Sequence, residues 1–196
     1  MAASPPLLLP MHLLDVHMPH YSRRVRHATF VRADHETVAG SIERVNLTQS
    51  SVLRVLFERC SPERCSLPRN GAIAVTALAE LGFVLFRSSG GAEIAVGAMW
   101  MPTERGLERV AATAAGFCAD ASCATRILIH FGVSAAGVKH STLAIETRLE
   151  TSRGAGAVQA LAHWDAFHRL GAVARRDVLL AIKQHAESCA KSGSWD

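Results

Sequence analysis

Hydrophobic and polar residues alternate along four short segments in the second half of the chain. Two of these segments, 82–86 and 93–100, are separated by a turn that contains two glycines. The other two, 126–133 and 141–149, meet around Gly137. Alternation with a period of two predicts strands that turn one face toward a core and the other toward solvent or a second layer. The pattern therefore predicts two antiparallel hairpins.

The first half of the chain predicts one strand followed by helices. Residues 24–33 alternate as a strand, and Asp34 is a good N-cap for the helix after it. A second short helix is predicted at about 51–60, and a third at 73–81. The intervening segment 60–71 contains prolines and an Asn-Gly pair, so it is predicted to be a loop.

A long amphipathic helix is predicted from about 157 to about 188. Its apolar stripe is expected to face the sheet and consists of Leu161, Trp164, Phe167, Leu170, Gly171, Ala174, Val178, Ala181 and Ile182. Small residues at Gly171, Ala172 and Ala174 make this stripe thin in the middle of the helix. The sheet is therefore expected either to pack closely against the helix at this point or to leave a space there.

Together these elements predict the α+β class, with a curved antiparallel sheet wrapped around the long C-terminal helix and two short helices after the first strand. Such a sheet often encloses an apolar cavity against its helix. We expect one domain over residues 13–188, preceded by a flexible N-terminal segment at 1–12 and followed by a tail at 189–196. The alanine-rich stretch 103–124 shows no clear period and is predicted to be partly helical.

The composition is that of a globular protein, with 49% apolar residues and a formal net charge of +4 over 196 residues. Basic residues are not interleaved with aromatic ones, which argues against a nucleic-acid surface. The apolar segment 5–10 is too short and too rich in proline for a signal peptide or a membrane span. Five cysteines are an odd number, so we expect no disulfide framework and a cytoplasmic protein.

Six segments, in the same order along the chain, resemble a bacterial family of unknown function within the START-like superfamily, whose members are also called helix-grip or SRPBCC proteins. The resemblance covers roughly residues 13–187 and rests on His27–Ala33 followed by a helix, Ser51–Phe57, Gly82–Phe86, Glu93–Gly97, Ile145–Leu149, and Trp164 ahead of Arg175–Leu180. It implies a helix-grip fold and a hydrophobic cavity. Superfamily relatives include lipid carriers, plant hormone receptors, aromatase/cyclases and chaperone activators, so no particular chemistry is implied.

Two segments depart from the family pattern. Residues 116–123 stand where the family has a stretch containing Phe and Pro-Gly. His163-Trp164 stands where it has Tyr-Trp. Both changes are expected at a cavity rim, so the resemblance does not imply that a ligand is shared.

The cysteines form two pairs with the same spacing, Cys60 with Cys65 and Cys118 with Cys123. Two such pairs could supply the four thiolates of a structural zinc site or a redox pair. Four intervening residues and the lack of a turn glycine inside either pair instead favour unrelated, partly buried thiols. We therefore predict no metal and no cofactor.

Several ionisable residues are candidates for polar chemistry. His27 and His168 are candidate general bases because imidazole titrates near neutrality. Glu146 and Arg148 share one face of a strand, where they either anchor the polar end of a ligand or form an ion pair with neighbouring strands or the final helix. His130 is expected to face away from the core.

The leading hypothesis is a non-catalytic protein that binds an apolar or amphipathic small molecule between the sheet and the final helix. Two alternatives stay open: an enzyme of the cyclase/dehydratase kind that uses the same cavity, and a protein-interaction module whose cavity has collapsed. The sequence fixes neither the ligand nor the oligomeric state. The predicted ligand-binding residues are Phe83, Leu85, Trp100, Ile129, Phe131, Ile145, Trp164, Phe167 and His168.

Overall fold

The structure is a computed structural model that describes residues 12–55, 74–104, 106–119, 125–151 and 154–193. Its six strands form one antiparallel sheet in the order β1-β6-β5-β3-β2, with β4 paired to β3. The strands are β1 (Arg23–Val31), β2 (Val84–Arg87), β3 (Glu93–Thr103), β4 (Gly106–Val110), β5 (Thr125–Gly137) and β6 (His140–Thr151).

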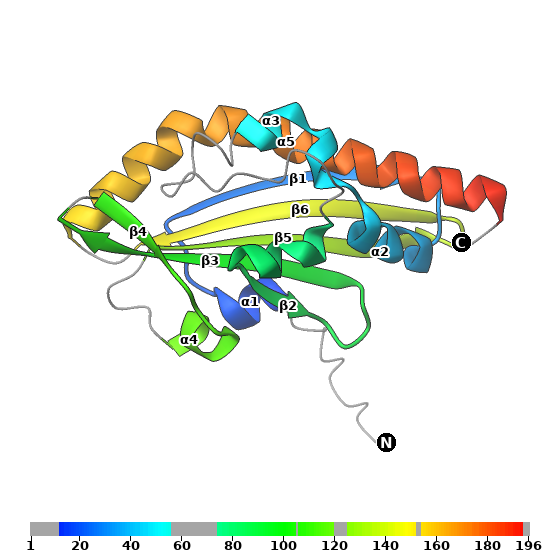
Figure 1. Cartoon of the computed structure of the whole chain (residues 1–196). Helices are drawn as coiled ribbons and strands as arrows, with labels where there is room; N and C mark the ends of the chain where they lie inside the picture. Colours follow the sequence, from blue (N-terminus) through cyan, green and yellow to red (C-terminus); the bar gives the residue numbers. More distant parts are fainter. Residues whose placement is uncertain (1–11, 56–73, 105, 120–124, 152–153, 194–196) are drawn as a thin grey trace, which may run out of the picture.

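The helices lie on both sides of this sheet. They are α1 (Leu13–His17), α2 (His35–Arg44), α3 (Ser51–Val55), α4 (Ala114–Ala119), α5 (Ala155–Ser192) and the 3₁₀ helices η1 (Leu47–Gln49) and η3 (Val75–Leu81). The long helix α5 runs along one side of the sheet, whereas α1 and α4 lie on the other (Figure 1). We call the side facing α5 the concave face. This arrangement confirms the predicted helix-grip fold, including the short helices α2 and α3 after the first strand.

Local sequence signals account for the start of α2. The Asp34 side chain accepts a hydrogen bond of 2.8 Å from the backbone N–H of Thr37, as expected of an N-cap. This bond from Thr37 lowers the pKa of Asp34 below its ordinary value, against a smaller opposing effect of burial. The predicted cap is therefore confirmed by its geometry.

Several element boundaries differ from those predicted. The stretch 103–124 contributes the strand β4 as well as the short helix α4, and β4 extends the sheet by pairing with the end of β3. The segment predicted as a helix at 73–81 is the 3₁₀ helix η3. Helix α5 begins two residues earlier than predicted and continues to Ser192, into the expected tail. The predicted flexible segment lies outside the described residues except for His12.

The main core lies between the concave face, α2 and the C-terminal part of α5. Val31, Ile94 and Leu143 of the sheet are almost fully buried there. Ile42 from α2 and Ile182 from α5 complete the contact. These positions follow the predicted alternation of the strands and the predicted stripe of the helix. Apolar periodicity therefore accounts for which residues are buried in this layer.

A second core covers the opposite, convex face of the sheet. Met18 beside α1 and Phe117 from α4 are fully buried against Leu128 of β5. Gly97 on β3 makes room for α4, because a Cβ atom at this position would lie 2.8 Å from the Phe117 ring. The alternation of the strands left open whether this face meets solvent or a second layer, and the structure shows a second layer.

Buried charges lie beside the second core. Arg148 forms ion pairs with Glu146 at 2.9 Å and with Asp15 of α1 at 3.0 Å. Arg24 of β1 binds the second oxygen of Glu146 at 2.8 Å. The interpretation of Glu146 and Arg148 as an ion pair with neighbouring strands therefore agrees with the structure, except that α1 takes the place of the final helix. Both residues lie on the face opposite α5.

His130 also lies on the convex face, as predicted, but it is buried there. Its Nε2 atom lies 3.4 Å from the Glu93 carboxylate, which also accepts hydrogen bonds from His12 and the backbone N–H of Leu13. Burial lowers the pKa of His130, against the opposing attraction of Glu93. The chain entering α1 thus covers a histidine that the strand pattern placed away from the core.

None of the helices in the described part of the chain combines the length and the apolar character that crossing a membrane would require.

Candidate functional site

A cavity of about 530 Å³ lies between the concave face and α5. Its size falls within the range of roughly 300–1,000 Å³ that is typical of pockets for small molecules. The cavity lies mainly beside residues 155–173, which we call the first half of α5, and it ends near Val178 in the second half, residues 174–192.

The concave face supplies the floor of the cavity. Ile127 and Ile129 of β5 lie beside Leu149 and Thr147 of β6, in agreement with the register of these strands. Each of these residues belongs to the inward set of its strand's alternation, so the same period of two that builds the core also builds the floor. Trp100 of β3 and Leu107 of β4 line the cavity as well.

Helices supply the remaining walls. On α5, Trp164, Phe167 and Ala174 line the cavity, in the stripe predicted to face the sheet. Leu53 of α3 and Leu78 of η3 also line it. The thin middle of the stripe at Gly171 is thus next to space rather than against closely packed strands, which decides between the two options that the sequence left open.

The structure brings together most of the residues predicted to bind a ligand. Those that line the cavity are Phe83, Trp100, Ile129, Phe131, Ile145, Trp164, Phe167 and His168. Leu85 is absent from the lining: it pairs with Val96 near the edge of the sheet and packs against the main core. Whether any of these residues contacts a ligand stays a prediction.

The predicted rim segments differ in their placement. His163 lines the cavity, and its ring lies 4.7 Å from that of Phe167. Phe117, in contrast, is buried in the second core on the other side of the sheet. Phe117 is therefore not next to the cavity, and residues 120–123 of this segment lie outside the described residues.

Polar groups in the lining are few. They are Thr125, Thr147, Gln159, His163, His168 and Arg175. The hydroxyl of Thr147 and the indole N–H of Trp100 are buried without a hydrogen-bond partner among the described residues. Such groups are costly in an apolar environment unless something satisfies them.

Arg175 is the cationic side chain of the lining. Its Nε atom donates a long hydrogen bond of 3.4 Å to Nδ1 of His27 on β1. Its Nη2 atom is buried and has no hydrogen-bond partner among the described residues. Burial lowers the pKa of Arg175 to about 10, which leaves the guanidinium charged at neutral pH. Sequence analysis missed this residue, although it stands four positions after Gly171 on the same helix face.

The candidate general bases are placed differently from one another. His27 is partly buried, and burial lowers its pKa, with further lowering by the positive charges of Arg175 and Arg176. His168 is exposed at one side of the cavity, with its Nδ1 atom 2.7 Å from the backbone carbonyl of Asp165. Glu146, a candidate anchor for the polar end of a ligand, lies on the convex face and is bound by two arginines, so it does not face the cavity.

The two cysteines that the structure describes do not line the cavity. Cys118 is exposed and lies 3.3 Å from a ring nitrogen of His17, and Cys189 is partly buried on α5. Cys60, Cys65 and Cys123 lie outside the described residues. Among the residues that are described, no group of three or more histidines, cysteines and carboxylates is placed to hold a metal ion.

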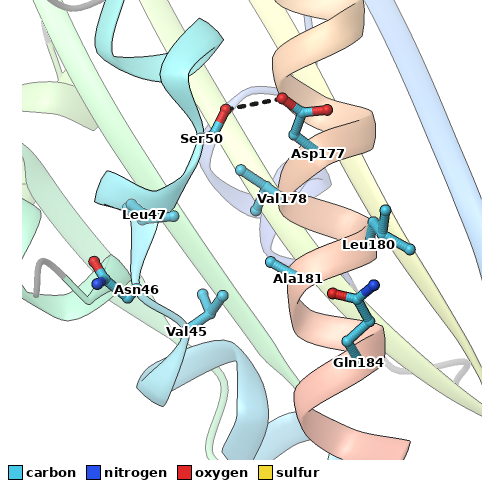
Figure 2. Close-up of a pocket in the computed structure, with 9 residues that line it drawn as sticks. All are labelled: Val45, Asn46, Leu47, Ser50, Asp177, Val178, Leu180, Ala181 and Gln184. Atoms are coloured by element: carbon cyan, nitrogen blue, oxygen red, sulfur yellow. Dashed lines mark hydrogen bonds between the residues drawn. The ribbon is translucent and has the colours of Figure 1, made fainter.

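A smaller hollow of about 240 Å³ lies on the other side of Val178, between α5 and the chain that follows α2. Figure 2 shows Ser50 donating a hydrogen bond of 3.1 Å to Asp177 across this hollow. Leu47 and Val178 line both hollows, so the two share a wall.

No protein-family model and no curated protein matches the chain. Solved structures match it over most of its length. The Zhui aromatase/cyclase from a Streptomyces species aligns with 89% of this chain and 99% of its own, at 12% identity and a TM-score of 0.37. A hypothetical protein from Helicobacter pylori aligns with 93% of this chain and 99% of its own, also at 12% identity and a TM-score of 0.37.

A START superfamily protein from Mycobacterium smegmatis aligns with 87% of this chain and 99% of its own, at 10% identity and a TM-score of 0.28. Because these scores are low, the helix-grip assignment rests on the strand order and on the position of α5 in this structure. No ligand or activity is carried over from these proteins.

Proposed function

We propose that this protein binds an apolar or amphipathic small molecule in the cavity between the sheet and α5. The observation that carries the proposal is the cavity of about 530 Å³ with its mainly apolar lining. Burying apolar surface contributes roughly 25 cal/mol per Å², so a ligand that displaces water from these walls would bind favourably. The interaction-module hypothesis predicts a collapsed cavity, so the cavity between the described residues of the sheet and α5 favours the binding hypothesis over it.

The proposal is tested by asking what the purified protein carries. The protein is purified without detergent, extracted with organic solvent, and the extract is analysed by mass spectrometry. A matched variant, Ala174→Phe, fills the cavity from α5 because Ala174 is 3% exposed and lines it. The control is Val173→Phe, since Val173 is 45% exposed and lies outside the lining.

A small molecule present at near-stoichiometric amount in the wild type and in Val173→Phe, and lost in Ala174→Phe, is the expected result. Circular dichroism shows whether Ala174→Phe retains its fold, because overpacking costs about 1–3 kcal/mol. A molecule that remains at full occupancy in folded Ala174→Phe would place its site elsewhere and overturn the proposal. An empty extract calls for the direct titrations described below.

A second candidate function is an enzyme that transfers protons inside the same cavity. The specific observation in its favour is that two histidines, His163 and His168, line the cavity. His168→Gln and His163→Gln, each assayed for turnover of any ligand that the extraction yields, test this candidate. Full turnover in both variants, with His27→Gln also active, would remove the acid/base groups on which it depends.

A further inference from the structure

Two arginines in the described part of the chain, Arg126 and Arg148, are buried, and both have partners for their charge. Arg126 forms an ion pair with Glu150 and donates to the backbone carbonyl of Phe117. Arg148 is held by Glu146 and Asp15. A buried guanidinium is normally compensated in this way, because removing an ion from water without a partner costs several kcal/mol.

Arg175 is only partly buried, but its Nη2 atom is buried and has no hydrogen-bond partner among the described residues. No carboxylate in the described part of the chain forms an ion pair with it, and its hydrogen bond goes to the uncharged nitrogen of His27. Because the pKa of His27 is lowered, its ring is neutral at pH 7 and its Nδ1 atom can accept this bond. The bond ties the Nε side of the guanidinium to β1 and leaves Nη2 without a partner.

Gly171 provides the space in which the guanidinium lies. A Cβ atom at this position would lie 3.2 Å from Nη1 of Arg175, closer than ordinary contact. The missing side chain therefore lets the arginine lie along α5 beside the cavity. A guanidinium is suited to binding a carboxylate or phosphate through two parallel hydrogen bonds.

We propose that the ligand is an amphipathic anion whose carboxylate or phosphate headgroup binds Arg175 while its apolar part fills the cavity. This inference rests on the proposed function and names the class of ligand. The anion supplies the compensating charge that the described residues do not. Thr147, whose hydroxyl is also without a partner and which lines the same cavity, is the expected second donor to the headgroup.

The test compares ligands that share a chain and differ in the headgroup. Decanoate, decyl phosphate and decanol are titrated calorimetrically into the wild type, Arg175→Gln, Arg175→Lys and Ala174→Phe. Arg176→Gln is the matched control because Arg176 is the exposed neighbour of Arg175. The order of the two anions distinguishes a carboxylate from a phosphate headgroup.

We expect the wild type to bind at least one anion about tenfold or more tightly than decanol, since hydrogen bonds between charged groups are the strong ones. Arg175→Gln should lose this preference and keep its affinity for decanol, Arg175→Lys should keep part of it, and Arg176→Gln should keep all of it. Equal affinity for the three ligands in the wild type, with weaker binding of all three to Ala174→Phe, would overturn the anion site and leave the proposed function intact. Binding of none, or binding that Ala174→Phe does not weaken, would overturn both proposals.

A second measurement needs no ligand. In protein stripped of bound molecules on a hydrophobic resin, Arg175→Met should raise Tm by about 2–4 °C, because an apolar chain replaces an uncompensated charge. Arg176→Met should change Tm little. A fall in Tm for Arg175→Met alone would show that the protein itself compensates the guanidinium, and this result would overturn the inference.

Discussion

The two halves of α5 belong to one continuous helix but have different surroundings. In the second half, Val178, Leu179, Ile182 and Ala186 are buried against α2 and the sheet. In the first half, Ala160 is the buried residue among the described side chains, although Trp164 and Phe167 face the same sheet. These two aromatic side chains thus lie in the half of α5 that has fewer buried residues.

This difference indicates that one part of α5 serves mainly the stability of the fold and the other serves the binding of a ligand. In the second half, the residues around Ile182 are closely packed and contribute to the free energy of folding, whereas Ala174 and Arg175 at its start still line the cavity. The first half stands beside a cavity, so part of its apolar surface is available for a ligand to cover. One apolar stripe therefore serves two purposes, and its periodicity is the same in both halves.

The largest effect is expected from a truncation in the second half. Ile182→Ala should lower the free energy of unfolding by about 2–5 kcal/mol, because Ile182 is 0% exposed and its removal leaves a void. Urea denaturation followed by circular dichroism measures this loss. The control is Leu180→Ala on the same helix, which should cost about 0.5 kcal/mol or less because Leu180 is 52% exposed. Equal losses in the two variants would mean that the second half is not packed as described.

A truncation in the first half should lower the free energy of unfolding much less. Trp164→Ala is expected to lower the free energy of unfolding by about 1 kcal/mol, well below the roughly 3–5 kcal/mol of a fully buried tryptophan. The reason is that Trp164 is only partly buried and faces the cavity. The same denaturation experiment tests it. A loss as large as that of Ile182→Ala would remove the distinction between the two halves.

The strands and the helix stripe were readable in the sequence because periodicity reports which residues face inward. Ile129, Ile145 and Trp164 could be placed on facing surfaces for this reason. Periodicity does not report the distance between two facing layers. The residues of the cavity lining and those of the core around Ile182 therefore look alike in the sequence, and only the fold separates them.

Two features were beyond such reasoning for other physical reasons. The second core depends on Met18, which follows the short helix α1, and on Phe117 of the short helix α4, and helices this short have little local signal of their own. The role of Arg175 depends on which charges are close to it in space. An arginine in a helix usually indicates a solvated face, and only the three-dimensional structure shows that no carboxylate among the described residues forms an ion pair with Arg175.

A smaller effect is expected at the junction of the two halves. Gly171→Ala should raise the free energy of unfolding by about 0.5–1 kcal/mol, because alanine favours a helix over glycine by about this amount. The new Cβ atom would displace the end of the flexible Arg175 side chain, which lies 3.2 Å from it. The reverse substitution at the exposed Ala166, Ala166→Gly, should lower the free energy of unfolding by a similar amount. It serves as a control because it measures the effect of helix propensity alone. A lower free energy of unfolding for Gly171→Ala would mean that the Arg175 side chain cannot move away, and that the helix is closely packed at this position.

The smallest effect is a pH dependence at the same junction. Burial, followed by the charges of Arg175 and Arg176, lowers the pKa of His27 in the folded protein below its ordinary value of about 6.5. The unfolded chain therefore takes up a proton at this site before the folded protein does. The stabilising contribution is complete above about pH 6.5 and is lost as the pH falls from there toward the folded pKa. In His27→Gln, urea denaturation at a series of pH values should show a smaller loss over this window, whereas an unchanged loss would assign the dependence to other histidines such as His130.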